Sequence, residues 1–146
     1  MAFKKEACDV VCVTLMYMTI FSKIITGEIP SYKVYENEYV YAMLDINPMQ
    51  EGHTLVIPKK EIAYLFDMEK GDYERLMEGV YHVACLLKER LQCKRVCMLV
   101  EGYQVEHVHV NLIPTWGEHD LDRKFVHVGS KEELESAHFK LLSSHR

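Results

Sequence analysis

Residues 107–114, with the sequence His-Val-His-Val-Asn-Leu-Ile-Pro, constrain the fold of this chain more than any other segment. Polar and apolar side chains alternate in this run, which is the pattern of a half-buried β-strand. In such a strand His107, His109 and Asn111 share one polar face, while the valines and the leucine between them face a core. Two neighbouring imidazoles indicate catalysis or metal binding. The alternative is a structural strand whose polar face happens to carry histidines.

The length and composition limit the classes of protein to which the chain can belong. Its 146 residues suit a single domain, and 49% hydrophobic with 27% charged residues is an ordinary globular balance. The formal net charge of −5, without a basic run, argues against long nucleic acids as partners. The apolar run near the N-terminus is too short to span a bilayer, so we expect no membrane partner. Five scattered cysteines favour reduced thiols and a cytoplasmic location, with access to the nucleus by diffusion.

Hydrophobic periodicity predicts one α+β domain built on an antiparallel sheet. We expect this domain to span residues 18–146 and residues 1–17 to be an N-terminal extension without an assigned role. The expected elements are a short helix at 19–25, a hairpin of strands at 32–36 and 39–44, a strand at 53–58, a long helix capped by Asp72, strands at 96–100 and 105–113, and a C-terminal helix at 131–142.

Four motifs follow one another along the chain: residues 19–31 (TIFSKIITGEIPS), residues 45–48 (DINP), residues 52–59 (GHTLVIPK) and residues 107–114. Their order and spacing resemble the histidine triad (HIT) family over roughly residues 18–114, and four ordered motifs arise by accident far less often than one. The family signature alternates three histidines with apolar residues, and Asn111 occupies its third position here. The resemblance implies a HIT-like fold: a five-stranded antiparallel sheet with one long helix and shorter helices, assembled as a homodimer.

The resemblance also implies a substrate class and roles for individual residues. Most characterised HIT branches hydrolyse or transfer nucleotides at an α-phosphate, through a covalent nucleotidyl-histidine that water resolves. By position, His109 is the nucleophile, Asp45 holds the ribose hydroxyls and His53 lies near the phosphate. The expected ligand is a purine nucleotide or a nucleotide conjugate. Its base and sugar would lie between the apolar side chains of Ile20, Phe21, Ile24, Ile29, Met43 and Ile46.

The chemistry of imidazole supports the role of His109 independently of the resemblance. If one ring nitrogen donates to a backbone carbonyl, the tautomer is fixed and the other nitrogen presents its lone pair as a nucleophile. Transfer at phosphorus also requires hydrogen-bond donors around the non-bridging oxygens. The candidates for this role are His107, Asn111, His53 and Gln104.

The chain departs from the family pattern in three places. Asn111 can donate a hydrogen bond but cannot exchange a proton near neutral pH, so departure of a poorly activated leaving group should suffer most. A related transferase branch carries glutamine there, so an amide is compatible with nucleotidyl transfer. The loop before the histidine strand is shortened to residues 101–104. Thr19 and Ser22 stand where zinc-binding members carry cysteines, so we expect no zinc there, and no cofactor.

Three functional classes remain open. The favoured class is a metal-independent nucleotide hydrolase or nucleotidyl transferase acting on a nucleoside phosphoramidate, an adenylate or a dinucleoside polyphosphate. The second is a nucleotide-binding or scaffold protein that kept the pocket and the dimer but lost turnover, for which Asn111 and the short loop are the best support. The third is a metal-dependent hydrolase using His107, His109 and His53, which lacks an obvious carboxylate ligand.

Overall fold

The computed structural model describes residues 18–143 of the chain, so the predicted extension at residues 1–17 lies outside the described residues. None of the helices among residues 18–143 is both long and apolar enough to cross a membrane. The elements in chain order are α2 (Ile20–Ile25), β1 (Lys33–Glu36), β2 (Val40–Leu44), β3 (Thr54–Pro58), the 3-10 helix η1 (Leu65–Asp67), α3 (Lys70–Leu91), β4 (Arg95–Leu99), β5 (Val110–Thr115), the 3-10 helix η2 (Arg123–Phe125) and α4 (Lys131–Leu142).

The five strands form one antiparallel sheet in the order β1-β2-β3-β5-β4. This architecture confirms the expected α+β fold with a five-stranded antiparallel sheet. In the register of the sheet Met43 lies opposite Leu55, Leu55 opposite Asn111, and Asn111 opposite Leu99. Directly opposed residues project from the same face of a sheet, so these four side chains form one row across four strands.

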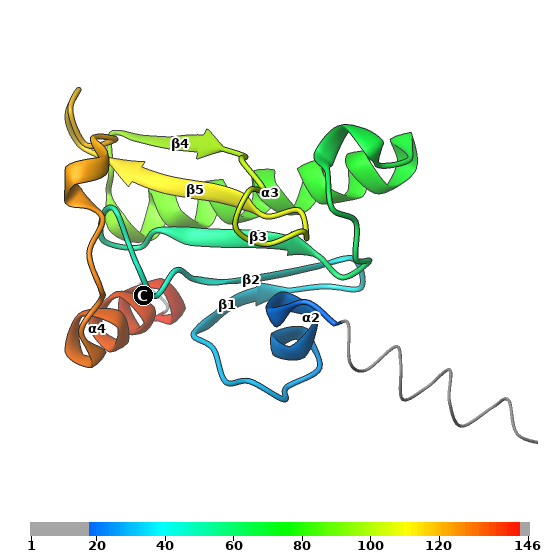
Figure 1. Ribbon diagram of the computed structural model, residues 1–146. Coiled ribbons are helices and arrows are strands. Elements are labelled where there is room, and N and C mark those ends of the chain that lie inside the picture. Colours follow the sequence, from blue (N-terminus) through cyan, green and yellow to red (C-terminus); the bar gives the residue numbers. More distant parts are fainter. Residues whose placement is uncertain (1–17, 144–146) are drawn as a thin grey trace, which may run out of the picture.

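The two faces of the sheet are covered by different helices (Figure 1). Helix α3 covers one face, and its apolar stripe forms the main core with the strands. The smaller helix α2 covers part of the other face, where a second cluster is built around Phe21 and Ile24. The main core contains Val40, Ala42, Val56, Val110 and Leu112 from the strands, Leu76, Val80, Val83 and Leu87 from α3, and Ala137 and Leu141 from α4.

The close approach of α3 to the sheet depends on Gly79. A Cβ atom at this position would lie 2.6 Å from Cγ2 of Val40, which is closer than two carbon atoms can approach. Glycine costs about 1 kcal/mol relative to alanine inside a helix, so its presence here reflects the packing against β2.

Two predicted boundaries are wrong. Helix α3 begins at Lys70 with Glu69 at its N-cap position, so Asp72 does not cap it; the Asp72 carboxylate instead accepts from Nζ of Lys60 at 2.7 Å. Strand β5 begins at Val110 rather than at residue 105.

The physical reason for the late start of β5 lies in its neighbour β3. The pairing of the two strands ends at Val56 and Val110, and Pro58, two residues further along β3, has no N–H to continue it. Val108, which would face Pro58, donates its N–H to the carbonyl of Ile62 at 2.8 Å. The two histidines therefore precede the regular strand.

Candidate active site

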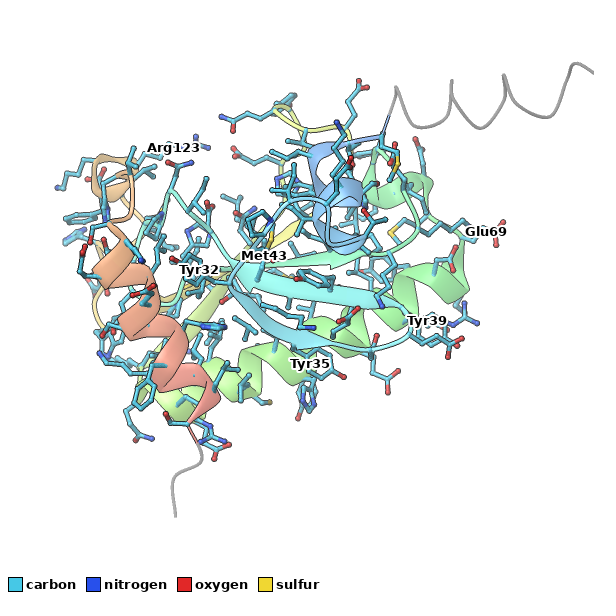
Figure 2. All side chains as sticks on the ribbon, turned by 90° about the horizontal axis from the view of Figure 1, so that it is seen from below. Tyr32, Tyr35, Tyr39, Met43, Glu69 and Arg123 are labelled. Carbon is cyan, nitrogen blue, oxygen red and sulfur yellow. The ribbon has the colours of Figure 1, made fainter. Side chains whose placement is uncertain are left out.

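A cavity of about 1070 Å³ opens on the sheet face that carries α2. The row of Met43, Leu55, Asn111 and Leu99 across the sheet lines it. Seen from below the sheet, α2 lies on one side of Met43 and the segment that carries Arg123 lies on the other (Figure 2). A concave, mostly apolar cavity with a few polar groups is the usual form of a small-molecule site.

His109 lines this cavity, and one of its ring nitrogens is committed to the backbone. Nδ1 lies 2.8 Å from the carbonyl oxygen of His107. Because a carbonyl can only accept, Nδ1 carries a hydrogen, and in the neutral ring Nε2 carries the lone pair. The ring of Phe21 packs against the imidazole, with ring centroids 5.0 Å apart and planes inclined by 60°. The structure thus supplies the fixed tautomer that a histidine nucleophile requires.

His107 does not share the polar face with His109, which corrects the expectation that a strand would align the two rings. Its side chain is 0% exposed and does not line the cavity. Nε2 donates to the carbonyl of Pro58 at 2.7 Å, and Nδ1 lies 2.8 Å from the hydroxyl of Thr19. Burial lowers the pKa of His107, since the charged imidazolium loses its hydration. His107 is therefore a buried neutral ring rather than a phosphate donor.

His53 and Asn111 form a pair at the cavity wall. The Nδ2 group of Asn111 donates to the carbonyl of Leu99 at 3.2 Å, which turns Oδ1 towards Nε2 of His53, 3.0 Å away. His53 must donate in this contact, and its Nδ1 accepts the backbone N–H of Met49 at 3.1 Å. Burial lowers the pKa of His53, although nearby Asp45 and Asn111 act in the opposite direction. Both nitrogens of His53 are thus engaged, and Asn111 keeps a second Nδ2 hydrogen that no described residue accepts.

Asp45 lines the cavity at the end of β2. Its Oδ1 accepts the backbone N–H of Asn47 at 2.8 Å, a turn contact that orients the carboxylate. The other oxygen, Oδ2, lies 3.7 Å from Nε2 of His53. The remaining acceptor capacity of Oδ2 is available to a ligand that brings hydroxyl groups.

The six predicted apolar contacts all line the cavity, but their burial divides them. Ile20 is 50% exposed and Ile46 is 61% exposed, so both offer apolar surface on the cavity wall that a ligand can cover. Ile24 of α2 and Met43 of β2 are buried in the second core cluster and also line the cavity. The lining includes all of Ile20, Phe21, Ile24, Ile29, Met43 and Ile46, together with Gln104.

The C-terminal segment completes the cavity, which no sequence motif indicated. Arg123 and Val126 belong to the lining although they lie far along the chain from the other members. Backbone contacts bring them there, including a hydrogen bond from the N–H of Gly129 to the carbonyl of Ile46 at 2.9 Å. Arg123 forms an ion pair with Glu101, which also lines the cavity. Met49, Leu99 and Tyr103 were missed as well, since they stand outside the recognisable motifs.

No three His, Cys, Asp or Glu side chains among residues 18–143 are arranged to hold a metal ion. Thr19 and Ser22, the two residues at the expected cysteine positions, form hydrogen bonds instead.

The chain resembles known proteins in both sequence and structure. The model of the HIT domain family matches residues 26–117. A HIT-like protein of Borreliella burgdorferi is 38% identical over 135 residues, which are 88% of this chain and 95% of that protein. The adenosine 5′-monophosphoramidase of Saccharomyces cerevisiae is 38% identical over 106 residues, 69% of this chain and 65% of the enzyme.

Solved structures show the same likeness. The crystal structure of a Hit-like protein from Bartonella henselae superposes with a TM-score of 0.73 at 31% identity, covering 84% of this chain and 93% of that one. A histidine triad nucleotide-binding protein from Sulfolobus tokodaii gives a TM-score of 0.71 at 32% identity, covering 83% and 87% of the two chains.

Proposed function

The chain belongs to the HIT domain family, and from this premise we propose that it is a nucleotide hydrolase or nucleotidyl transferase that attacks an α-phosphate with His109. Candidate substrates are a nucleoside phosphoramidate, an adenylate or a dinucleoside polyphosphate. We also propose that the base of the nucleotide is a purine, that the protein forms a homodimer and that it is located in the cytoplasm. The name of the yeast relative, a monophosphoramidase, supports the phosphoramidate in particular.

The observation that carries the proposal is the tautomer of His109. With Nδ1–H held by the carbonyl of His107, Nε2 can attack the α-phosphorus of a bound nucleotide. The new N–P bond forms while the bond from phosphorus to the leaving group breaks, and its electron pair departs with the leaving group. The positive charge that develops on the ring is stabilised by the carbonyl that accepts Nδ1–H. Water then attacks phosphorus and releases a proton to the solvent, while the N–P bond breaks and its electron pair returns to Nε2 of His109.

The cavity supplies the groups that would position the nucleotide. Asp45 is suited to the ribose hydroxyls because one carboxylate oxygen stays open after the contact with Asn47. The exposed isoleucines Ile20 and Ile46 offer apolar surface to the base and sugar. The second Nδ2 hydrogen of Asn111 is suited to a non-bridging phosphate oxygen, with Gln104 as a further donor. His53 holds Asn111 in orientation, and His107 holds His109, so we assign positioning roles to both.

Asn111 also predicts which substrates react well. An amide cannot transfer a proton to the departing group, so turnover should be faster when that group leaves without help. A phosphoramidate of a weakly basic amine should therefore outpace one of an alkylamine. If the missing proton transfer limits turnover, Asn111→His should raise kcat, since imidazole titrates near neutral pH.

A second candidate function is nucleotide binding without turnover. The observation that favours it is the engagement of Asn111, whose amide is already shared between His53 and Leu99. This class would keep affinity for the nucleotide but form no covalent intermediate.

Hydrolysis of a fluorogenic adenosine phosphoramidate tests the proposal. We expect turnover by the wild type, its loss in His109→Ala, and AMP binding by both proteins in calorimetry. His119→Ala is the matched control, because His119 is exposed and does not line the cavity. If the wild type binds AMP but does not hydrolyse the phosphoramidate, the proposed enzymatic function is contradicted and nucleotide binding without turnover is favoured.

A further inference from the structure

A chain of four polar side chains lies behind His109 and outside the cavity lining: Glu61, Ser22, Thr19 and His107. The hydroxyl of Ser22 hydrogen bonds to Oε2 of Glu61. Thr19 Oγ1 lies 3.2 Å from Ser22 Oγ and 2.8 Å from Nδ1 of His107. The same carboxylate oxygen lies 3.5 Å from the backbone N of Thr19. The proposed attack on phosphorus uses none of these side-chain contacts directly.

With His107 neutral, the hydrogens of this chain take one arrangement, in which no hydrogen lies between the hydroxyls of Thr19 and Ser22. The carbonyl of Pro58 accepts from Nε2 of His107, so Nδ1 of the neutral ring holds a lone pair and must receive the hydroxyl hydrogen of Thr19. The hydroxyl hydrogen of Ser22 goes to Glu61, which can only accept as a carboxylate. Thr19 Oγ1 also accepts the backbone N–H of Ser22 at 3.2 Å as the N-cap of α2.

His107 links this chain to the nucleophile in two ways. Its backbone carbonyl is the group that fixes Nδ1–H of His109. Its ring and that of His109 both pack against Phe21, with centroids 5.9 Å and 5.0 Å from the phenyl ring. A proton gained by His107 would therefore place a positive charge next to His109.

We propose that Thr19, supported by Ser22 and Glu61, is a positioning residue that fixes the hydrogen of His107 on Nε2 and thereby keeps the His107 carbonyl and the ring of His109 in place. The inference rests on the proposed function for its catalytic consequence only. Its structural claim, the tautomer of His107, can be measured without any substrate. The chain of contacts also ties α2, which supplies Ile20, Phe21 and Ile24 to the cavity, to the histidine that reacts.

Thr19→Asp is the decisive variant. A carboxylate still accepts the N–H of Ser22 and still caps α2, so the helix end is retained. When ionised it cannot donate to Nδ1 of His107, and its charge favours a proton on that nitrogen. Thr19→Ser is the matched control, because it keeps both the cap and the donor.

Nitrogen-15 NMR of the imidazole rings and steady-state kinetics are measured on all three proteins. We expect Nδ1 of His107 to lack a proton in the wild type and in Thr19→Ser, and to gain one in Thr19→Asp at neutral pH. We expect kcat to fall about tenfold or more in Thr19→Asp, as for other residues that orient a reactive group, with KM nearly unchanged because Thr19 does not line the cavity.

An unchanged His107 spectrum in Thr19→Asp would overturn the inference, and so would a changed spectrum with wild-type kcat. If the wild type itself shows no turnover, the proposed function fails. In that case the NMR spectra alone decide whether Thr19 controls the protonation of His107.

Discussion

His53 donates its Nε2 hydrogen to Oδ1 of Asn111 across 3.0 Å. The amide at the third position of the histidine motif therefore acts as the acceptor for a second histidine. The orientation follows from the other contacts of the pair. Leu99 offers a carbonyl to the Nδ2 group, and Met49 offers an N–H to Nδ1 of His53. The amide thus accepts a hydrogen bond from a buried neutral histidine and keeps one Nδ2 hydrogen that no described residue accepts.

Asn111→Ala should destabilise the protein because it leaves Nε2–H of His53 buried without an acceptor. An unsatisfied buried donor costs about 1–3 kcal/mol. Urea unfolding monitored by circular dichroism measures this change in the free energy of unfolding. The control is Gln104→Ala, which removes an exposed amide from the same cavity and should change stability by about 0.5 kcal/mol or less. Equal effects of the two substitutions would contradict the assigned hydrogen bond.

The stability of the fold should decrease as the pH falls below about 6.5, the pKa of histidine in an unfolded chain. Burial lowers the pKa of His53 and of His107 in the folded protein. Between the folded and unfolded pKa values the unfolded chain binds more protons, so acid favours unfolding by up to about 1.4 kcal/mol per pH unit for each histidine. Urea midpoints between about pH 5 and pH 8 test this dependence.

His127 should act in the opposite direction. Hydrogen bonds to the carbonyl of Phe125 and to the carboxylate of Glu133 raise its pKa, so its contribution is complete in acid and is lost as the pH rises through the raised pKa. The side chain is solvent-exposed, which makes this contribution small. His127→Gln should therefore steepen the loss of stability in acid relative to neutral pH only slightly. A protein that is more stable at pH 5 than at neutral pH would refute the assignment of His53 and His107 as buried neutral rings.

Gly79→Ala should destabilise the protein although alanine is the better helix former. The new Cβ would meet Cγ2 of Val40 at 2.6 Å, and overpacking of a core typically costs about 1–3 kcal/mol. Gly71→Ala is the matched control in the same helix, since its Cβ would meet nothing nearer than a flexible arginine end at 3.6 Å. It should stabilise α3 by up to about 1 kcal/mol. Thermal unfolding of the two variants should thus shift in opposite directions; a gain in stability in Gly79→Ala would disprove the tight packing of α3 on β2.

Asp45→Asn should weaken the binding of ribonucleotides while preserving the loop. The amide oxygen can still accept the N–H of Asn47, but the charged acceptor for the ribose hydroxyls is lost. Hydrogen bonds to a charged group contribute about 1.5–3 kcal/mol, so AMP affinity should fall about tenfold or more. Calorimetry with AMP and 2′-deoxy-AMP measures the effect. The wild type should bind AMP more tightly than 2′-deoxy-AMP, and the variant should lose that preference. An equal preference in both proteins would show that Asp45 does not bind the ribose.

The sequence predicted the sheet and most of the cavity because alternation and ordered motifs are local signals. The strand positions around Met43 and Leu55 and the helix after Thr19 follow directly from such patterns. The burial of His107 does not follow from such a pattern, because it depends on where the pairing of β3 with β5 ends. Pro58 interrupts the ladder one strand away, and the histidine then turns into the protein rather than onto its surface.

Contacts between segments that are distant in the chain could not be predicted from sequence patterns either. Arg123 and Val126 reach the cavity through backbone hydrogen bonds that carry no residue signature, such as the one between Gly129 and Ile46. The cap of α3 was misplaced because Asp72 is a good capping residue, yet its carboxylate binds Lys60 and Arg75 instead. Asp72 lies in the first turn of α3, one turn after the N-cap position, which the sequence pattern assigned to it.

Mass spectrometry of the protein caught during turnover tests whether His109 is the nucleophile. The wild type is mixed with excess adenosine phosphoramidate, denatured within one turnover at alkaline pH, digested and compared with His109→Ala treated in the same way. We expect an added adenylyl group on the peptide that contains residues 107–114, located on His109 by fragmentation and missing from the variant. Turnover without an adduct on His109, or an adduct that persists in His109→Ala, would contradict the assignment of His109 as the nucleophile.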